Sequence, residues 1–201
     1  MKGLLNSFFF VPNGRNSVKV GELLVAEPFM KDKWFGRSVI SVIDSSENEG
    51  TTGLVLNIEI TATLSEIFND VKRDGVPVFC GGPVGHDQLL FLHTLGDGII
   101  PDGKEILPGL WLGGNFSSAV EYVNSGYPID GHIRFFVGYS GWSPGQLADE
   151  LNENTWAVPD RAFSSHGLLT GNGNNYWTKI VASMGNRYRP WLVVPEDSRA
   201  N

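Results

Sequence analysis

Short apolar runs, each bounded by Gly, Pro, Asn or Asp, recur along the first two thirds of the chain and predict strands. The clearest is the run in which Ile133, Phe135 and Val137 recur at a period of two, which places them on one face of a strand. We predict strands at 23–26, 38–43, 53–57, 76–79, 88–93 and 133–138, and a further one at 191–194.

Helices are marked by capping residues and by apolar positions three and four residues apart. Thr63 and Glu66 have the spacing of a capping box, and an apolar stripe over 64–71 follows them. Further helices are predicted from Ser117 or Ser118 to Gly126, and from Tyr176 to Met184 with Gly185 at the end.

Another helix start combines Ser143 as a capping hydroxyl, Pro144 in the first turn and Gln146 as the partner of the cap. We predict a helix from there to about Asn152. A tight turn over 138–142 would join it to the preceding strand. A capping serine contributes about 1 kcal/mol to such a helix.

The irregular mixture of strands and helices favours a single α+β domain over a doubly wound parallel sheet. Residues 1–20 are predicted to form an N-terminal arm, whose apolar part at 4–11 is a strand or a partner-binding segment and not a signal peptide. The domain is predicted to span 21–201. Within it, 164–175 is rich in Gly and Asn and predicts a mobile loop before a C-terminal helix and strand.

Composition and charge narrow the classes of function. A net charge of −7 with a pI near 5.0 opposes direct binding of duplex DNA, and the 15 basic residues are not gathered in one segment. No run approaches the roughly 20 apolar residues of a membrane-spanning helix. Cys80 is the single cysteine, which excludes an intrachain disulfide and agrees with a reducing cytoplasm.

A series of short motifs in a fixed order carries a resemblance to a known family. They are Gly21-Glu22-Leu23-Leu24-Val25-Ala26-Glu27-Pro28, Asp32 to Val39, Gly53-Leu54-Val55-Leu56-Asn57, Gly81-Gly82-Pro83-Val84, Leu92-His93, Arg134 to Trp142, Gln146-Leu147, Glu150-Leu151 and Trp156. In this order and spacing they resemble the AlgH/YqgE family of bacterial proteins.

The resemblance implies an α+β domain with a bifurcated mixed sheet that curls into a pseudo-barrel, with helices packed around it. Members of that family are often called transcriptional regulators, because one was linked to exopolysaccharide gene expression. No reaction or ligand is established for them, so the resemblance implies a biochemically uncharacterised protein.

Two glycine-containing segments raise the question of chemistry. Ser140, in Gly138-Tyr139-Ser140-Gly141-Trp142, has the context of a nucleophile elbow but not the glycine two places after the serine, so a structural role is favoured. Gly81, Gly82 and Pro83 could present backbone amides to an anion, although the lysine of a phosphate-binding loop is missing. A turn is favoured there, and this loop is the first candidate for a ligand site.

Polar residues elsewhere give weaker candidates. His93 ends a strand and is interpreted as a hydrogen-bonded structural histidine, and the four histidines show no metal-binding spacing. Asp32 and Arg37 lie on one short connection, where an ion pair or a cap is favoured over ligand binding. Cys80 follows a strand, and a core position is favoured over a redox role.

Trp142, Gln146, Glu150 and Trp156 form a last group, since the first three recur every four residues. Structural roles are favoured for them, and a pocket lined by Gln146 and Glu150 is the alternative. No catalytic residue, metal site or cofactor is predicted. The sequence therefore favours a non-enzymatic cytoplasmic regulatory or binding protein that acts through a protein partner or a small ligand. The alternative is an enzyme of unknown class with a pocket near the loop from Gly81 to Val84.

Overall fold

The computed structural model describes residues 11, 12 and 14–195, and the predicted apolar arm at 4–11 lies almost wholly outside them. The strands are β1 (Leu23–Ala26), β2 (Val39–Ser46), β3 (Gly50–Val55), β4 (Glu59–Thr63), β5 (Pro77–Cys80), β6 (Val84–His93), β7 (Lys104–Leu107), β8 (Leu110–Leu112), β9 (Ile133–Trp142) and β10 (Trp156–Ala157). The helices are α2 (Leu64–Ile67), α3 (Phe116–Asn124), α4 (Gln146–Asn152), α5 (Ser165–Leu168), α6 (Gly173–Ser183) and the 3-10 helix η1 (Asn186–Val193).

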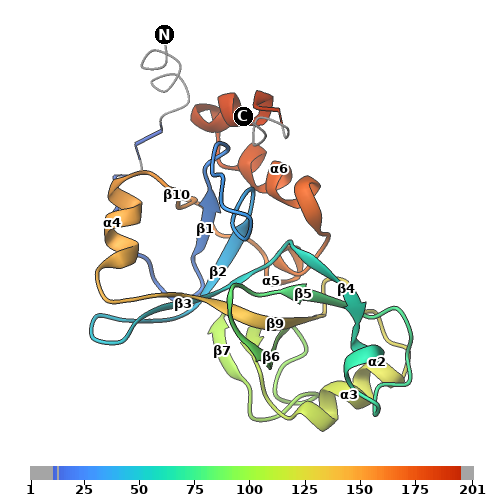
Figure 1. The fold of residues 1–201 in the computed structure, drawn as a ribbon. Coiled ribbons are helices and arrows are strands. Elements are labelled where there is room, and N and C mark those ends of the chain that lie inside the picture. The colour runs from blue at the N-terminus through green and yellow to red at the C-terminus, as the bar shows by residue number, and fades with distance from the viewer. Residues whose placement is uncertain (1–10, 13, 196–201) are drawn as a thin grey trace.

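Ten strands form one mixed sheet, and β9 lies at its centre (Figure 1). The main strand order is β10-β1-β2-β3-β9-β6-β8-β7, while β4 pairs with β5 and β5 pairs with β9. The pair of β5 with β9 is parallel, and the other pairs are antiparallel. The predicted α+β class is confirmed.

The sheet divides into two branches along one edge of β9. The first half of β9 pairs with β5 at 135–137, and its last residues pair with β3 at 140–142. The opposite edge of β9 pairs with β6 from Ile133 to Tyr139. The sheet is therefore bifurcated, and the fork lies where β5 and β3 separate.

Glycines allow the backbones at this fork to approach closely. A Cβ atom on Gly81 would stand 2.1 Å from the Gly138 carbonyl oxygen, and one on Gly82 would stand 2.4 Å from the Ser140 nitrogen. Gly138 has a φ of 71°, in the region that favours glycine, so β9 bends there and continues. The predicted tight turn over 138–142 is wrong, because β6 pairs with Tyr139 and β3 pairs with residues 140–142, so the strand continues through Trp142.

The two ends of the sheet approach each other and close it into a pseudo-barrel, although β1 and β7 are not joined by strand pairing. Gly21, two residues before β1, lies against β7, since a Cβ atom there would stand 2.4 Å from the Leu107 side chain. Apolar side chains from β1, β2, β3, β6 and β9 fill the interior, and α5, α6 and η1 add to the same core. Figure 1 shows α6 and η1 beside β1 and β2, with α2 and α3 together at the far branch.

Several predicted helices begin or end elsewhere. The capping box of α2 is present, with the Thr63 amide donating to Glu66 at 2.7 Å, but Phe68 is extended and ends the helix after one turn. Helix α3 is capped by Asn115, whose side chain accepts from the Ser118 amide, and not by Ser117 or Ser118. Asn is among the best capping residues, and its position before Phe116 decided the start.

Helix α4 begins at Gln146, and the predicted capping bond from the Ser143 hydroxyl is absent from it. Its preceding residue, Gly145, has a φ of 83°, so Ser143 and Pro144 belong to a turn outside the helix. The Gln146 side chain accepts from the Ser143 amide at 3.1 Å, which keeps half of the expected capping box.

The C-terminal segment is more helical than predicted. Residues 191–194 do not form a strand, because Trp191 stacks on Trp177 at 6.4 Å and lies in η1 with Pro190. The predicted loop at 164–175 contains α5, which Ser164 caps by accepting from the Gly167 amide at 3.1 Å. Among residues 11, 12 and 14–195, no helix is long and apolar enough to cross a membrane.

Candidate functional site

Glu150 uses its carboxylate to join three side chains that the sequence singled out. One of its oxygens accepts from the indole nitrogens of Trp142 at 2.8 Å and Trp156 at 2.6 Å. The other accepts from the Gln146 amide at 3.0 Å. Both tryptophans are at least 95% buried and pack edge to face at 5.9 Å. These bonds support the favoured structural interpretation of this group, and we call it the Glu150 cluster.

The loop at Gly81 and Gly82 is also engaged in the fold. Both glycines are buried against β9, and the Gly81 carbonyl oxygen accepts from the buried Ser140 hydroxyl at 3.1 Å. Pro83 is exposed. Ser140 therefore joins β9 to the glycine loop at the fork, and its buried hydroxyl cannot reach a ligand. Burial raises the pKa of the Cys80 thiol, which is the opposite of what a reactive thiolate needs.

His93 is fully buried and has backbone partners for both ring nitrogens. Its Nε2 lies 3.0 Å from the Gly113 carbonyl oxygen, and its Nδ1 accepts from the Leu95 amide at 3.3 Å. These partners assign the hydrogen to Nε2 of a neutral ring. Burial lowers the pKa of His93, with the Gly113 bond acting in the opposite direction. The predicted hydrogen bonds of His93 are present, and they support a structural role.

Asp32 and Arg37 do not form an ion pair with each other in the structure. Asp32 accepts from the amides of Trp34 and Phe35 at 2.7 and 3.1 Å, which is the capping role. Arg37 is buried, stacks over the Trp177 ring at 4.8 Å and donates to the Val194 carbonyl oxygen. It also borders an open polar cleft of about 400 Å³, together with Lys33, Gly36, residues 57–59 and residues 172–174.

Arg134 is a buried cation that the sequence showed only as a strand residue. It is 3% exposed, donates to the carbonyl oxygens of Leu56, Leu169 and Gly171, and lies 4.2 Å from the Phe79 ring centroid. Burial lowers its pKa. It thus fastens the segment before α6 to the sheet. Within the described ranges, no group of three His, Cys, Asp or Glu side chains is arranged to hold a metal ion.

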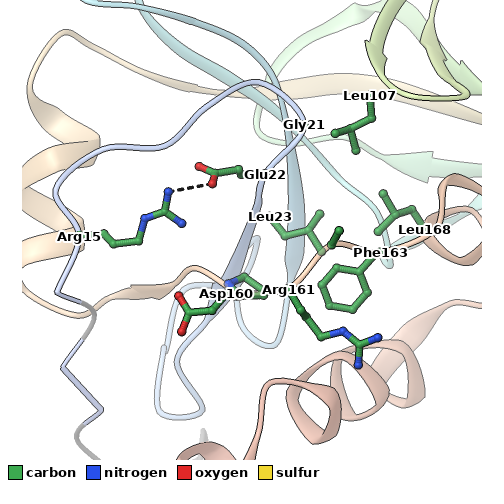
Figure 2. A pocket seen from close by; sticks show the side chains of 11 residues that line it. Arg15, Gly21, Glu22, Leu23, Leu107, Asp160, Arg161, Phe163 and Leu168 are labelled. Atoms are coloured by element: carbon green, nitrogen blue, oxygen red, sulfur yellow. Dashed lines mark hydrogen bonds and ion pairs between the residues drawn. The ribbon is translucent and has the colours of Figure 1, made fainter.

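A pocket of about 380 Å³ lies where the two ends of the sheet meet, and we call it the seam pocket (Figure 2). It is lined by Arg15, residues 21–23, Leu107, residues 159–163 and Leu168. A turn from Lys19 to Glu22 begins it, closed by a bond of 3.0 Å between the Glu22 amide and the Lys19 carbonyl oxygen. Gly21 stands third in this turn with a φ of 85°, which a type II turn requires there.

The seam pocket has an apolar side and a charged rim. Figure 2 shows Leu23, Phe163 and Leu168 grouped on one side, with the carboxylates of Glu22 and Asp160 across from them. Arg15 pairs with Glu22 at 2.8 Å, and these two side chains are 31% and 28% exposed. Such a combination of apolar wall and few polar groups is typical of a small-ligand site.

The residues of this pocket carried little signal in the sequence. Glu22 and Leu23 belong to a recognised motif, but the strand pattern already explains that motif. They line a pocket only because Leu107 lies opposite them in the closed sheet. Arg161 and Phe163 follow the last motif and are brought to β1 only by the fold. The sequence does not show that these apolar and charged residues line one pocket, because only the closed sheet brings them together.

Comparison with known proteins shows to which family the chain belongs. A family model described as AlgH-like matches residues 23–189. The chain belongs to the AlgH-like family. A protein of Parabacteroides distasonis named as a UPF0301 protein is 39% identical over 182 residues, which are 90% of each chain. One of the same name from Bacteroides thetaiotaomicron is 38% identical over 177 residues, 88% of each. The resemblance stated from the motifs is confirmed.

Two solved structures extend the likeness to the fold. A crystal structure of a Corynebacterium diphtheriae protein has a TM-score of 0.72 at 22% identity, over 89% of this chain and 94% of the other. The solution structure of the AlgH protein from Pseudomonas aeruginosa has a TM-score of 0.63 at 26% identity, over 83% and 88%. The biochemical function of this AlgH-like chain is not given by these relatives.

Proposed function

We propose that this AlgH-like protein is a non-enzymatic regulatory protein of the bacterial cytoplasm, which binds a small ligand in the seam pocket and acts through a protein partner. The seam pocket carries this proposal. Its volume of about 380 Å³ lies within the usual range for ligand sites, roughly 300 to 1,000 Å³, and it offers both an apolar wall and charged groups.

The alternative site at the loop of Gly81 and Gly82 has less support. The Gly81 amide, which would have to face an anion, already donates to the Val137 carbonyl oxygen at 2.9 Å, and both glycine backbones pack on β9. A ligand there would compete with the hydrogen bonds and the backbone packing that hold the fork together. The seam pocket, in contrast, is already an open space of about 380 Å³.

A thermal-shift screen with a metabolite library tests the proposal. A ligand at tenfold its Kd stabilises the folded state by about 1.4 kcal/mol, which is roughly 3 to 5 °C in Tm for a chain of this size. We expect at least one compound to give this shift. The same compound should give none with Ala162→Trp, because Ala162 lines the seam pocket and an indole would fill it.

Ala182→Trp is the matched control, since Ala182 is exposed on α6 and does not line the seam pocket. It should keep the shift. If hits bind Ala162→Trp as well as wild type, the ligand site lies elsewhere. If the library gives no hit with any variant, the proposal of a small-ligand protein is contradicted.

The proposal also includes indirect action on gene expression. With a net charge of −7, the protein is expected not to bind duplex DNA tightly by itself, so a partner would read the bases. A gel-shift assay at physiological salt measures this. Sequence-specific binding at nanomolar concentration would contradict it.

A further inference from the structure

The acidic groups at the rim of the seam pocket are already occupied by the protein itself. Glu22 accepts on both carboxylate oxygens, from the Arg15 guanidinium at 2.8 Å and from the Lys19 amide at 2.7 Å. Asp160 accepts from Arg187 at 2.6 Å. A cationic ligand would have to displace one of these partners, so the carboxylates do not favour a cation.

Arg161 is the exception among the charged groups of the rim. No carboxylate of the described residues pairs with it, while the two acidic residues of the pocket, Glu22 and Asp160, pair with Arg15 and Arg187. Its guanidinium lies 5.3 Å from the Phe163 ring centroid. A cation–π contact uses no hydrogen-bond acceptor, so the N–H groups of the guanidinium still need a partner of another kind.

Phe163 therefore places an apolar surface and a cation side by side. A ligand that covers the Phe163 ring brings its polar end within reach of Arg161, because only 5.3 Å separate the guanidinium from the ring centroid. Figure 2 shows Leu23 and Leu168 beside the same ring. The planar fork of an arginine matches a carboxylate with two parallel hydrogen bonds.

The charged groups around the pocket indicate how much charge the polar end of the ligand carries. Arg15 and Arg187 already compensate the rim carboxylates of Glu22 and Asp160, and the whole chain has a net charge of −7. The first negative charge on a ligand is compensated by Arg161, whereas each additional one meets only the net negative charge of the chain. A singly charged carboxylate fits this balance better than a doubly charged phosphate.

We propose that the seam pocket binds a small amphipathic monocarboxylate, with its carboxylate on Arg161 and its apolar body against Phe163 and Leu168. This ligand class rests on the proposed function of the same pocket. The volume of about 380 Å³ limits the ligand to a short alkyl or single-ring body, since it lies near the lower end of known ligand sites.

Isothermal titration of the full chain with octanoate, octanol and octyl phosphate tests the ligand class. We expect octanoate to bind most tightly. Arg161→Gln should weaken octanoate about tenfold, which corresponds to about 1.4 kcal/mol, and should leave octanol unchanged. Arg189→Gln is the control, because it removes the same charge from an exposed residue that does not line the pocket.

Three results would overturn the monocarboxylate: an octanoate affinity that Arg161→Gln leaves unchanged, an equal loss with Arg189→Gln, or tighter binding of octyl phosphate. The Ala162→Trp variant separates this failure from that of the proposed function. If octanol and octanoate bind equally and Ala162→Trp abolishes both, the pocket binds ligands without a preference for anions. If Ala162→Trp changes neither, the seam pocket is not the site.

Discussion

The Glu150 cluster and the seam pocket both combine aromatic and charged side chains, but they use them differently. In the cluster, one carboxylate accepts from Trp142, Trp156 and Gln146, and the two indoles are buried. At the seam, Arg161 lies next to Phe163 with no carboxylate partner among the described residues. In the Glu150 cluster the charged group finds its hydrogen-bond partners within the chain, whereas at the seam the Arg161 donors remain for a ligand.

This difference shows that the most recognisable motifs of the chain encode its fold. The cluster joins β9, α4 and β10, and the glycine loop occupies the fork, so both motifs carry structural bonds. Substitutions there should reduce stability, whereas substitutions at the seam should change binding at nearly constant stability.

The largest expected effect is that of Trp142→Ala. Removal of a buried indole leaves a cavity and deprives Glu150 of one donor, so we expect a loss of about 3 to 5 kcal/mol in the free energy of unfolding. Urea unfolding measures it. Arg161→Gln is the comparison and should stay within about 0.5 kcal/mol of wild type. A Trp142→Ala protein of nearly wild-type stability would show that the cluster does not hold the fold.

Gly82→Ala should have the next largest effect. Gly82 has a φ of 151°, and an added Cβ atom would stand 2.3 Å from the Tyr139 carbonyl carbon and 2.4 Å from the Ser140 nitrogen. Because these are backbone atoms, the fork must open, and we expect a loss of about 3 kcal/mol. Gly98→Ala is a suitable control, since nothing lies within 4 Å of its added Cβ. Equal stabilities of the two variants would contradict the close packing at the fork.

The two serines near the end of β9 should differ in their contribution to stability, and Ser143 should lack the contribution that its predicted capping role implied. Ser140→Ala removes a buried hydrogen bond to Gly81 and should cost about 1 kcal/mol, whereas the exposed Ser143 has no capping bond to lose. Ser143→Ala should therefore stay within about 0.5 kcal/mol of wild type. Urea unfolding of both, measured side by side, checks the order. The reverse order would restore Ser143 as the cap.

The smallest expected effect is a pH dependence from His93. Burial lowers its pKa in the folded state, so the unfolded chain takes up a proton that the folded chain does not. This contribution to stability is complete above the ordinary histidine pKa of 6.5 and declines as the pH falls below it. Titration of the His93 ring by NMR, folded and in urea, measures both states. A folded pKa equal to or above the unfolded one would contradict the sign.

The sequence predicted the parts of the fold that depend on local patterns. The strands at 23–26 and 133–138 were found, because alternating or continuous apolar residues are bounded by polar ones. It missed β4, β7, β8 and β10, which are short and become strands only by pairing: β4 with β5, β7 with β8, β8 also with β6, and β10 with β1. The error at 191–194 has the same cause, since the packing of Trp191 on Trp177 outweighs local β propensity.

The candidate site was predicted less well than the fold. The motifs drew attention to His93, Gln146 and Glu150, and the hydrogen bonds of these residues support a structural role. The seam pocket depends on Gly21 meeting Leu107 across the closed sheet. Such a long-range contact leaves no periodic or spacing signal in a single sequence, so Arg161 and Phe163 stood outside every motif.

The most direct test of this account is to map a bound ligand on the backbone amides by NMR, with octanoate and any compound selected by the library screen. We predict saturable shift changes at Gly21, Leu107, Phe163 and Leu168, and unchanged amides in the Glu150 cluster and at Gly82. Changes confined to Gly82 or to residues 146–150 would contradict the account, and would return the ligand site to the motifs that we assign to the fold.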